Sequence, residues 1–75
     1  MKYIEELDNG DTFELDNNFY VLTSDFKKSG DRLSYSLQNG SPKWLSSQTI
    51  VEAVPLYFLD RDNNTVAIKI KNALT

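Results

Sequence analysis

Apolar and polar residues alternate along this chain in runs of strand length, and short polar segments separate the runs. These segments are rich in Asp, Asn and Gly, residues that tolerate a positive φ or hydrogen-bond their own backbone, so each can reverse a strand. Four of them stand out: Asp8–Asp11, Asp16–Asn18, Asn39–Ser41 and Arg61–Asn64. The pattern predicts an all-β protein built from antiparallel strands.

A β-hairpin is predicted around the second turn segment. Residues 12–15 alternate, which places Phe13 and Leu15 on one face of a strand. After the turn, residues 19–23 are apolar on both faces, a pattern typical of a central or covered strand. We expect these two strands to pair.

The middle of the chain predicts a loop, two strands and a short turn. Residues 24–31 are polar and are expected to form an exposed loop. Residues 46–49 suit one 3₁₀ turn, and residues 50–54 resume a strand that ends where Pro55 removes a hydrogen-bond donor. Residues 32–38 alternate, and we expect the larger side chains to face the core and the serines to face solvent: Leu33, Tyr35 and Leu37 against Ser34 and Ser36.

The two ends of the chain give different signals. Residues 3–7 fit the period of a strand and that of a single helical turn, and both interpretations stay open. Residues 56–59 and 65–71 predict a C-terminal hairpin, and residues 72–75 are expected to fray. One face of the second strand of this hairpin is expected to carry its branched apolar residues: Val66, Ile68 and Ile70.

Length and composition limit the classes of function that the chain can have. The 75 residues are expected to form a single small β domain, residues 1–75, that buries only about 60% of its unfolded surface. The chain has no cysteine and no histidine, so it lacks the catalytic thiol, the commonest proton shuttle and the usual zinc ligands. A hydroxyl nucleophile would need a lysine base, and Lys27 and Lys28 lie in a segment suited to solvent. We expect a non-enzymatic protein without cofactor or metal.

The first residues and the hydropathy of the chain bear on its location. The chain begins with an acidic segment rather than an apolar one, and no apolar run approaches the length of a membrane span. The absence of cysteine fits a reducing compartment. We expect a cytoplasmic protein that does not contact a membrane.

Charge is distributed unevenly. Residues 1–25 hold seven acidic residues and one lysine, a net charge of −6, whereas residues 26–75 hold seven basic and four acidic residues, a net charge of +3. Two interpretations are open. The charges neutralise one another across paired strands, or an acidic face steers the protein toward a basic partner.

A family resemblance is carried by residues 7–54. It consists of a Gly-Asp turn before a strand, a charged loop, an Asn-Gly turn and a Trp-Leu-Ser-Ser segment: Leu7–Phe13, Tyr20–Leu22, Leu33–Leu37, Asn39-Gly40 and Trp44–Ser47. This order resembles small SH3-like barrels, including many short phage-encoded proteins. The resemblance implies a small antiparallel barrel or a strongly curved sheet with a 3₁₀ turn, and the C-terminal hairpin at residues 56–71 exceeds the minimal barrel. The chain lacks the Ala-Leu-Tyr-Asp-Tyr motif and the paired tryptophans of peptide-binding SH3 domains. An OB-like barrel is the alternative fold.

One segment has the spacing of a metal-binding loop. Asp60, Asp62 and Asn64 are placed as in the opening of a calcium loop, but Thr65 replaces the turn glycine and Lys71 the closing glutamate. We expect a polar hairpin turn here and no metal site.

The aromatic residues are too many for a small core. Nine are present, and each ring buries about 150–250 Å² when it is enclosed. Adjacent rings on a strand point to opposite faces, so one member of the pairs at 19–20 and 57–58 must leave the core. We expect Tyr20, Trp44 and Tyr57 to form an exposed patch.

Three functional hypotheses follow. The first is a protein-interaction module, such as a phage-type modulator or inhibitor of a host protein, that binds a protein partner through the aromatic patch and the acidic N-terminal residues: Tyr20, Trp44, Tyr57, Glu5, Glu6, Asp8, Asp11 and Glu14. The second is a barrel that binds single-stranded nucleic acid, against the net charge of −3, through Lys27, Lys28, Arg32, Lys43 and Trp44. The third is a small phage structural or assembly protein, which would form a homo-oligomer.

Overall fold

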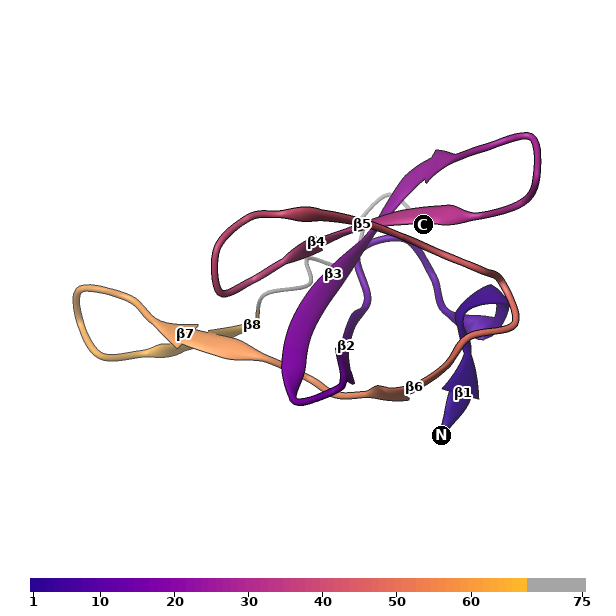
Figure 1. Cartoon of the computed structure of the whole chain (residues 1–75). Helices are drawn as coiled ribbons and strands as arrows, with labels where there is room; N and C mark the ends of the chain where they lie inside the picture. Colours follow the sequence, from indigo (N-terminus) through magenta and orange to yellow (C-terminus); the bar gives the residue numbers. More distant parts are fainter. Residues whose placement is uncertain (68–75) are drawn as a thin grey trace, which may run out of the picture.

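The computed structural model describes residues 1–67. This part of the chain consists of antiparallel strands and one short 3₁₀ helix (Figure 1): β1 (Lys2–Tyr3), η1 (Ile4–Glu6), β2 (Thr12–Leu15), β3 (Asn18–Phe26), β4 (Arg32–Ser36), β5 (Pro42–Leu45), β6 (Ile50–Ala53), β7 (Tyr57–Leu59) and β8 (Thr65–Ala67). The predicted all-β class is therefore confirmed.

The strands form two sheets. The larger has six strands in the order β1-β6-β2-β3-β4-β5, and the smaller is the hairpin of β7 and β8. Strands β2 to β5 follow one another as a meander, after which β6 returns to pair with β2 on one side and β1 on the other. Figure 1 shows that the large sheet is strongly curled and that the hairpin projects away from it. Within residues 1–67 no sheet closes on itself.

All four predicted turn segments contain a residue in the left-handed region. Asp16 and Asn17 have φ values of 52° and 66° and join β2 to β3 directly, as in a type I′ hairpin. The other three turns use Gly10, Gly40 and Asn63. The Asn- and Asp-rich composition therefore located these four turns correctly. A further reversal, at Gly30, joins β3 to β4 within the expected loop at 24–31, of which residues 24–26 belong to β3.

The N-terminal segment contains both of the alternatives that its sequence left open. Strand β1 comes first, and η1 follows it. Two backbone bonds hold the segment to the chain before β6: the Ile4 N–H donates to the Thr49 carbonyl at 2.9 Å and the Glu5 N–H to that of Ser47 at 3.1 Å. Residues 46–49 form a single turn, as expected, closed by the i+3 to i bond from the Thr49 N–H to the Ser46 carbonyl.

The core lies on the inner side of the curled sheet. It is built from one apolar cluster: Ile4, Leu7, Phe13, Tyr20, Leu22, Leu45 and Val51. Phe13 and Tyr20 are opposite one another in the β2–β3 register, and their rings stack with centroids 5.5 Å apart. Tyr20 is only 7% exposed. The expectation that Tyr20 contributes to a surface patch is therefore wrong, because its register partner draws it to the inner face.

Strand β4 differs from the prediction at Ser34 and Tyr35. Ser34 is fully buried, whereas Tyr35 is 39% exposed. Ser34 is opposite Leu22, a core residue, so the serine faces inward and Tyr35 faces outward. Leu33 is buried, as expected, although it is not part of the apolar cluster on the inner side. The Ser34 hydroxyl donates to the Lys43 carbonyl at 3.1 Å, which satisfies it inside the core. Leu37 lies beyond β4 and is also exposed.

The C-terminal hairpin follows a break at Pro55, as expected. Tyr57 pairs with Ala67 and Leu59 with Thr65. The remaining predictions for this region, the placement of Ile68 and Ile70 and the fraying of residues 72–75, fall outside the described residues.

Candidate interaction surfaces

The large sheet has a second apolar face on its outer side. The register places Val21 opposite Tyr35, and Trp44 opposite Leu33, which shares a face with Tyr35. Phe19, two residues before Val21, is on the same side. We call Phe19, Val21, Tyr35 and Trp44 the outer apolar face; Tyr35 and Trp44 are each 39% exposed, and the other two are half-buried.

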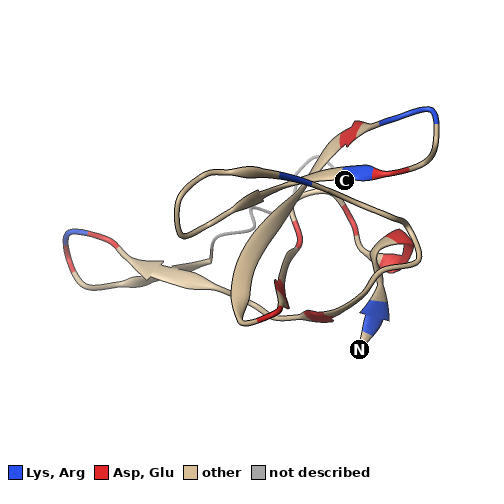
Figure 2. Ribbon diagram, in the orientation of Figure 1, with Lys and Arg blue, Asp and Glu red and all other residues tan. Residues whose placement is uncertain are grey.

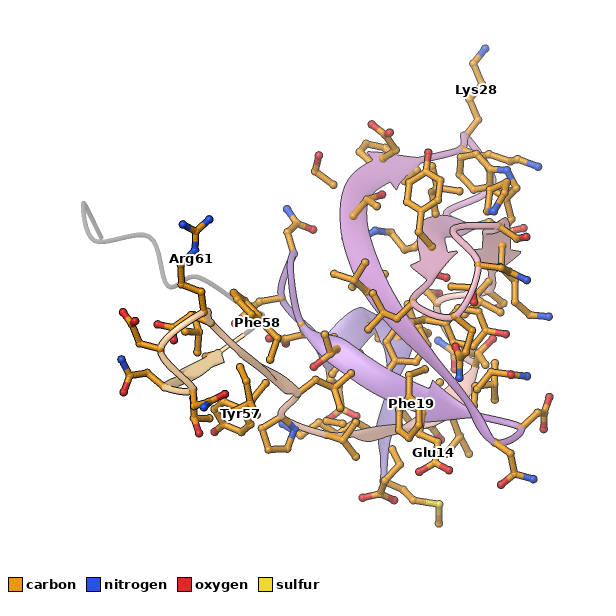
Figure 3. All side chains as sticks on the ribbon, turned by 90° about the vertical axis from the view of Figure 1, so that its left-hand side faces the viewer. Glu14, Phe19, Lys28, Tyr57, Phe58 and Arg61 are labelled. Atoms are coloured by element: carbon orange, nitrogen blue, oxygen red, sulfur yellow. The ribbon has the colours of Figure 1, made fainter. Side chains whose placement is uncertain are left out.

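Opposite charges lie at opposite corners of the outer apolar face. Glu14 is opposite both Phe19 and Glu52, which gives one corner two carboxylates. At the other corner the Lys27 ammonium lies 4.6 Å from the centroid of the Trp44 ring, within range of a cation–π interaction. Figure 3 views the molecule from the side on which Glu14 and Phe19 are seen together, with Lys28 projecting at the distant end.

The β7–β8 hairpin is a second exposed apolar surface. Tyr57, Phe58 and Leu59 are 58%, 49% and 64% exposed. Because successive strand residues point to opposite faces, the hairpin exposes apolar side chains on both of its faces. Figure 3 shows Tyr57 and Phe58 on this hairpin, well separated from Phe19. A two-stranded ribbon of this kind is marginally stable unless something packs on it.

A groove of about 260 Å³ separates the hairpin from the large sheet. Its walls are mainly apolar and include Leu7, Val54, Leu56 and Tyr57. The Thr12 hydroxyl donates to the Val54 carbonyl at its base. The groove therefore offers an apolar recess directly beside the exposed ring of Tyr57.

The predicted aromatic patch is thus divided between two places. Trp44 belongs to β5 in the large sheet, and Tyr57 belongs to β7 in the hairpin. Phe19, Tyr35 and Phe58 were not predicted to be surface residues. For Phe19 and Phe58 a signal was present, because each belongs to an adjacent aromatic pair of which one ring had to leave the core.

The acidic N-terminal residues are spread over three elements. Glu5 and Glu6 belong to η1, Asp8 and Asp11 to the loop after it, and Glu14 to β2. Figure 2, in the orientation of Figure 1, shows acidic residues in red at several separate places along the ribbon. Several of them serve local structure: Glu6 accepts from the Tyr3 N–H at 2.8 Å and Asp11 from the Asp8 N–H at 2.7 Å. Glu14 is the one that lies beside the outer apolar face.

The predicted basic groove is only partly assembled. Lys27 and Trp44 meet, and Lys28 is exposed. Lys43 alternates with Trp44 along β5 and so belongs to the opposite face. The Arg32 guanidinium is half-buried and donates to the Asn9 side chain and to the Thr23 carbonyl, the latter at 2.7 Å, so it holds the β3–β4 hairpin together.

The Asp60 segment is a hydrogen-bonded turn. One Asp60 oxygen, Oδ1, accepts the N–H groups of Asp62 at 2.8 Å and Asn64 at 2.9 Å. The bond from the Asn64 backbone is the main reason that the pKa of Asp60 is lowered from its usual value of 3.8. Among the described residues, no three acidic side chains are grouped so as to hold a metal ion.

Comparison of the chain with protein-family models, with curated proteins and with solved structures found no match. None of the helical structure within residues 1–67 is long and apolar enough to cross a membrane.

Proposed function

We propose that this protein is a non-enzymatic interaction module that binds a protein partner through the β7–β8 hairpin. The observation that carries the proposal is the exposure of Tyr57, Phe58 and Leu59 beside an apolar groove. Large apolar side chains grouped on a projecting element mark interaction sites on small proteins, and tyrosine and other aromatic residues often dominate the binding energy.

The surrounding charges favour a partner with a basic surface. Most of the acidic residues of the first 25 positions are exposed, and an acidic surface of this kind accelerates encounter with a basic partner at low ionic strength. In this proposal the hairpin supplies affinity and the carboxylates supply orientation. The resemblance to short phage-encoded proteins extends it to a cytoplasmic modulator or inhibitor of a host protein.

The finer fold assignment belongs to the same proposal. A four-strand meander followed by a strand that returns to pair with the first is a plan compatible with an SH3-like barrel, and β2 to β6 have this order. The hairpin is then an addition to the barrel, and a natural place for a function that other barrels lack.

Site-specific photocrosslinking tests the hairpin surface. A photoreactive phenylalanine analogue at Tyr57 is expected to capture a bacterial lysate protein, whereas the same analogue at the exposed Lys28 is not. Excess unlabelled protein should compete for the capture, and a Tyr57→Ser/Phe58→Ser variant should not. The proposal is contradicted if the Tyr57 and Lys28 positions capture the same proteins, or if the double variant competes as well as the original chain.

Single-stranded nucleic acid binding is a second candidate, favoured by one observation. The Lys27 ammonium over the Trp44 ring places a cation beside an exposed aromatic surface on which a base can stack. A titration of fluorescently labelled single strands at low salt tests it. Saturable binding at micromolar protein that weakens with salt and is lost in Trp44→Ala would support this function, and absence of binding would remove it.

A further inference from the structure

We propose that the outer apolar face binds the same face of a second copy of this chain, which makes the protein a two-fold symmetric dimer. The face lies on the large sheet and not on the hairpin, so this inference goes beyond the proposed function. A chain that failed to dimerise could still bind its partner through Tyr57 and Phe58.

Strand β3 is apolar on both sides, and β4 is apolar on its outer side. The inner side of β3 carries the core residues Tyr20 and Leu22, opposite the serines of β4, and the outer side of the two strands carries Phe19, Val21, Tyr35 and the buried Leu33. A sheet with one face in water normally alternates apolar and polar residues, and strands that are apolar on both sides are typical of sheets covered on both faces. In β4 the alternation is even reversed, since the serine is inside and the tyrosine outside. Selection for a solvated outer face would not produce this arrangement.

The charges at the two corners of the face are complementary. The Glu14 corner carries Glu14, Glu52 and the exposed Asp16, with the N-terminal ammonium 3.8 Å from Glu52. The other corner carries Lys27, directly over Trp44, and Lys28, near Asp25 and Asp31 in sequence. A two-fold axis that exchanges the corners places each Glu14 near the Lys27 of the other copy, so the attraction occurs twice.

The geometry of the sheet accommodates such an axis. Glu14 of β2 is opposite Phe19 of β3, and Trp44 of β5 is opposite Leu33 of β4. The two corners are therefore separated by three strand spacings across the sheet and by about four residues along the strands. With a rise of about 3.3 Å per residue and a strand spacing of about 4.8 Å, the offsets are about 13 Å and about 14 Å. Their midpoint falls near the Val21–Tyr35 pair, the centre of the apolar residues. The two-fold axis lies in the interface, passes through this point and is perpendicular to the line that joins the two corners. The strands of the two sheets then cross at nearly a right angle, which is one of the two packings that sheets adopt.

We therefore expect a second copy of this chain, rather than an unrelated chain, to cover the outer apolar face. The interface between the two copies is modest in size. Four strands of up to nine residues present a patch of about 20 × 30 Å, less than the roughly 800 Å² per partner of a standard interface. We expect a reversible dimer with a dissociation constant in the micromolar range.

Charge reversal tests the dimer and its symmetry. Sedimentation equilibrium on the intact chain is expected to show a monomer–dimer equilibrium. Glu14→Lys alone and Lys27→Glu alone should each weaken association by about tenfold or more, because both contacts then become repulsive. An equimolar mixture of the two variants should dimerise again, since both contacts of the heterodimer join unlike charges. Glu5→Lys and Lys43→Glu make the same charge changes away from the face and should leave association unchanged.

Three outcomes would overturn the inference. The first is an intact chain that remains monomeric at several hundred micromolar. The second is a dimer that both single variants leave intact, which would place the contact on another surface. The third is a mixture that stays monomeric. As a check independent of any variant, dilution of the ¹⁵N-labelled chain should shift amide resonances of Phe19, Val21, Tyr35 and Trp44; shifts confined to the hairpin would also exclude the outer apolar face.

Discussion

At the scale of single residues, Ser34 shows how a small polar side chain becomes part of a core. It is fully buried at the centre of β4, where its hydroxyl donates to the Lys43 carbonyl. A hydrogen-bonded hydroxyl contributes modestly to stability. The small volume of the serine side chain lets the inner side of the curled sheet pack closely around it. Tyr35, one position away, keeps its ring outside.

Substitutions at these two positions test the orientation of β4. Ser34→Leu is expected to lower the free energy of unfolding by about 1–3 kcal/mol, because extra methylenes are forced into a packed core. Tyr35→Ser should change it by about 0.5 kcal/mol or less in the monomer. Urea unfolding followed by circular dichroism at low protein concentration measures both. If Ser34→Leu left the free energy of unfolding unchanged and Tyr35→Ser lowered it, Tyr35 and not Ser34 would face the core.

At the scale of elements, the turns decide where each strand begins and ends. The β2–β3 connection needs two successive residues with positive φ, and Asp16 and Asn17 tolerate this better than most residues do. The β7–β8 connection depends instead on the Asp60 carboxylate, which accepts two backbone N–H groups.

Replacing Asp16-Asn17 with Asn-Gly is expected to stabilise the protein by up to about 1 kcal/mol, since this dipeptide is the preferred one in type I′ turns. Asn17→Val should destabilise it by about 1–2 kcal/mol, because a branched side chain resists positive φ. Thermal or urea unfolding of the two variants provides the measurement. Equal stabilities would mean that the turn does not have the left-handed conformation.

The hairpin turn should respond to pH. The folded pKa of Asp60 is lowered from its usual value of 3.8, so the stabilising effect of the carboxylate is present above this value and is lost as the pH falls through the folded pKa. The amide resonances of Asp62 and Asn64 are expected to titrate with a midpoint below 3.8. In Asp60→Asn this titration should disappear. A midpoint above about 4 would contradict the hydrogen-bonded carboxylate.

At the scale of the whole molecule, stability depends on one small core. A domain of this length has roughly 4–11 kcal/mol of stability in total. Its largest fully buried side chain is that of Phe13, which stacks on Tyr20 and joins β2 to β3. The projecting hairpin and the outer apolar face contribute surface rather than core.

Two phenylalanine substitutions separate core from surface. Phe13→Ala should cost about 3–5 kcal/mol, enough to unfold much of the population. Phe26→Ala, at a ring that is 69% exposed, should cost about 0.5 kcal/mol or less. Near-ultraviolet circular dichroism and the unfolding midpoint report on both. If both variants were equally stable, Phe13 would not be a buried residue of the core.

The candidate surfaces could be predicted only in part. Adjacent aromatic residues at 19–20 and 57–58 correctly implied that some rings lie outside the core, because strand neighbours diverge. Which ring of the first pair is enclosed depended on Phe13, a residue in another strand. The exposed positions of Trp44 and Tyr57 agree with expectation, but their separation on two different sheets could not be derived from sequence spacing.

The amino-acid sequence by itself determined the all-β class and the places where the chain reverses, since both depend on local preferences of residues for extended or left-handed backbone. Only the tertiary structure decided which side of each strand is inside. A period of two defines two faces without saying which one is buried. In β4, the pairing of Ser34 with Leu22 turned the serine inward and Tyr35 outward. The outer apolar face exists because long-range register overrode local hydrophobicity.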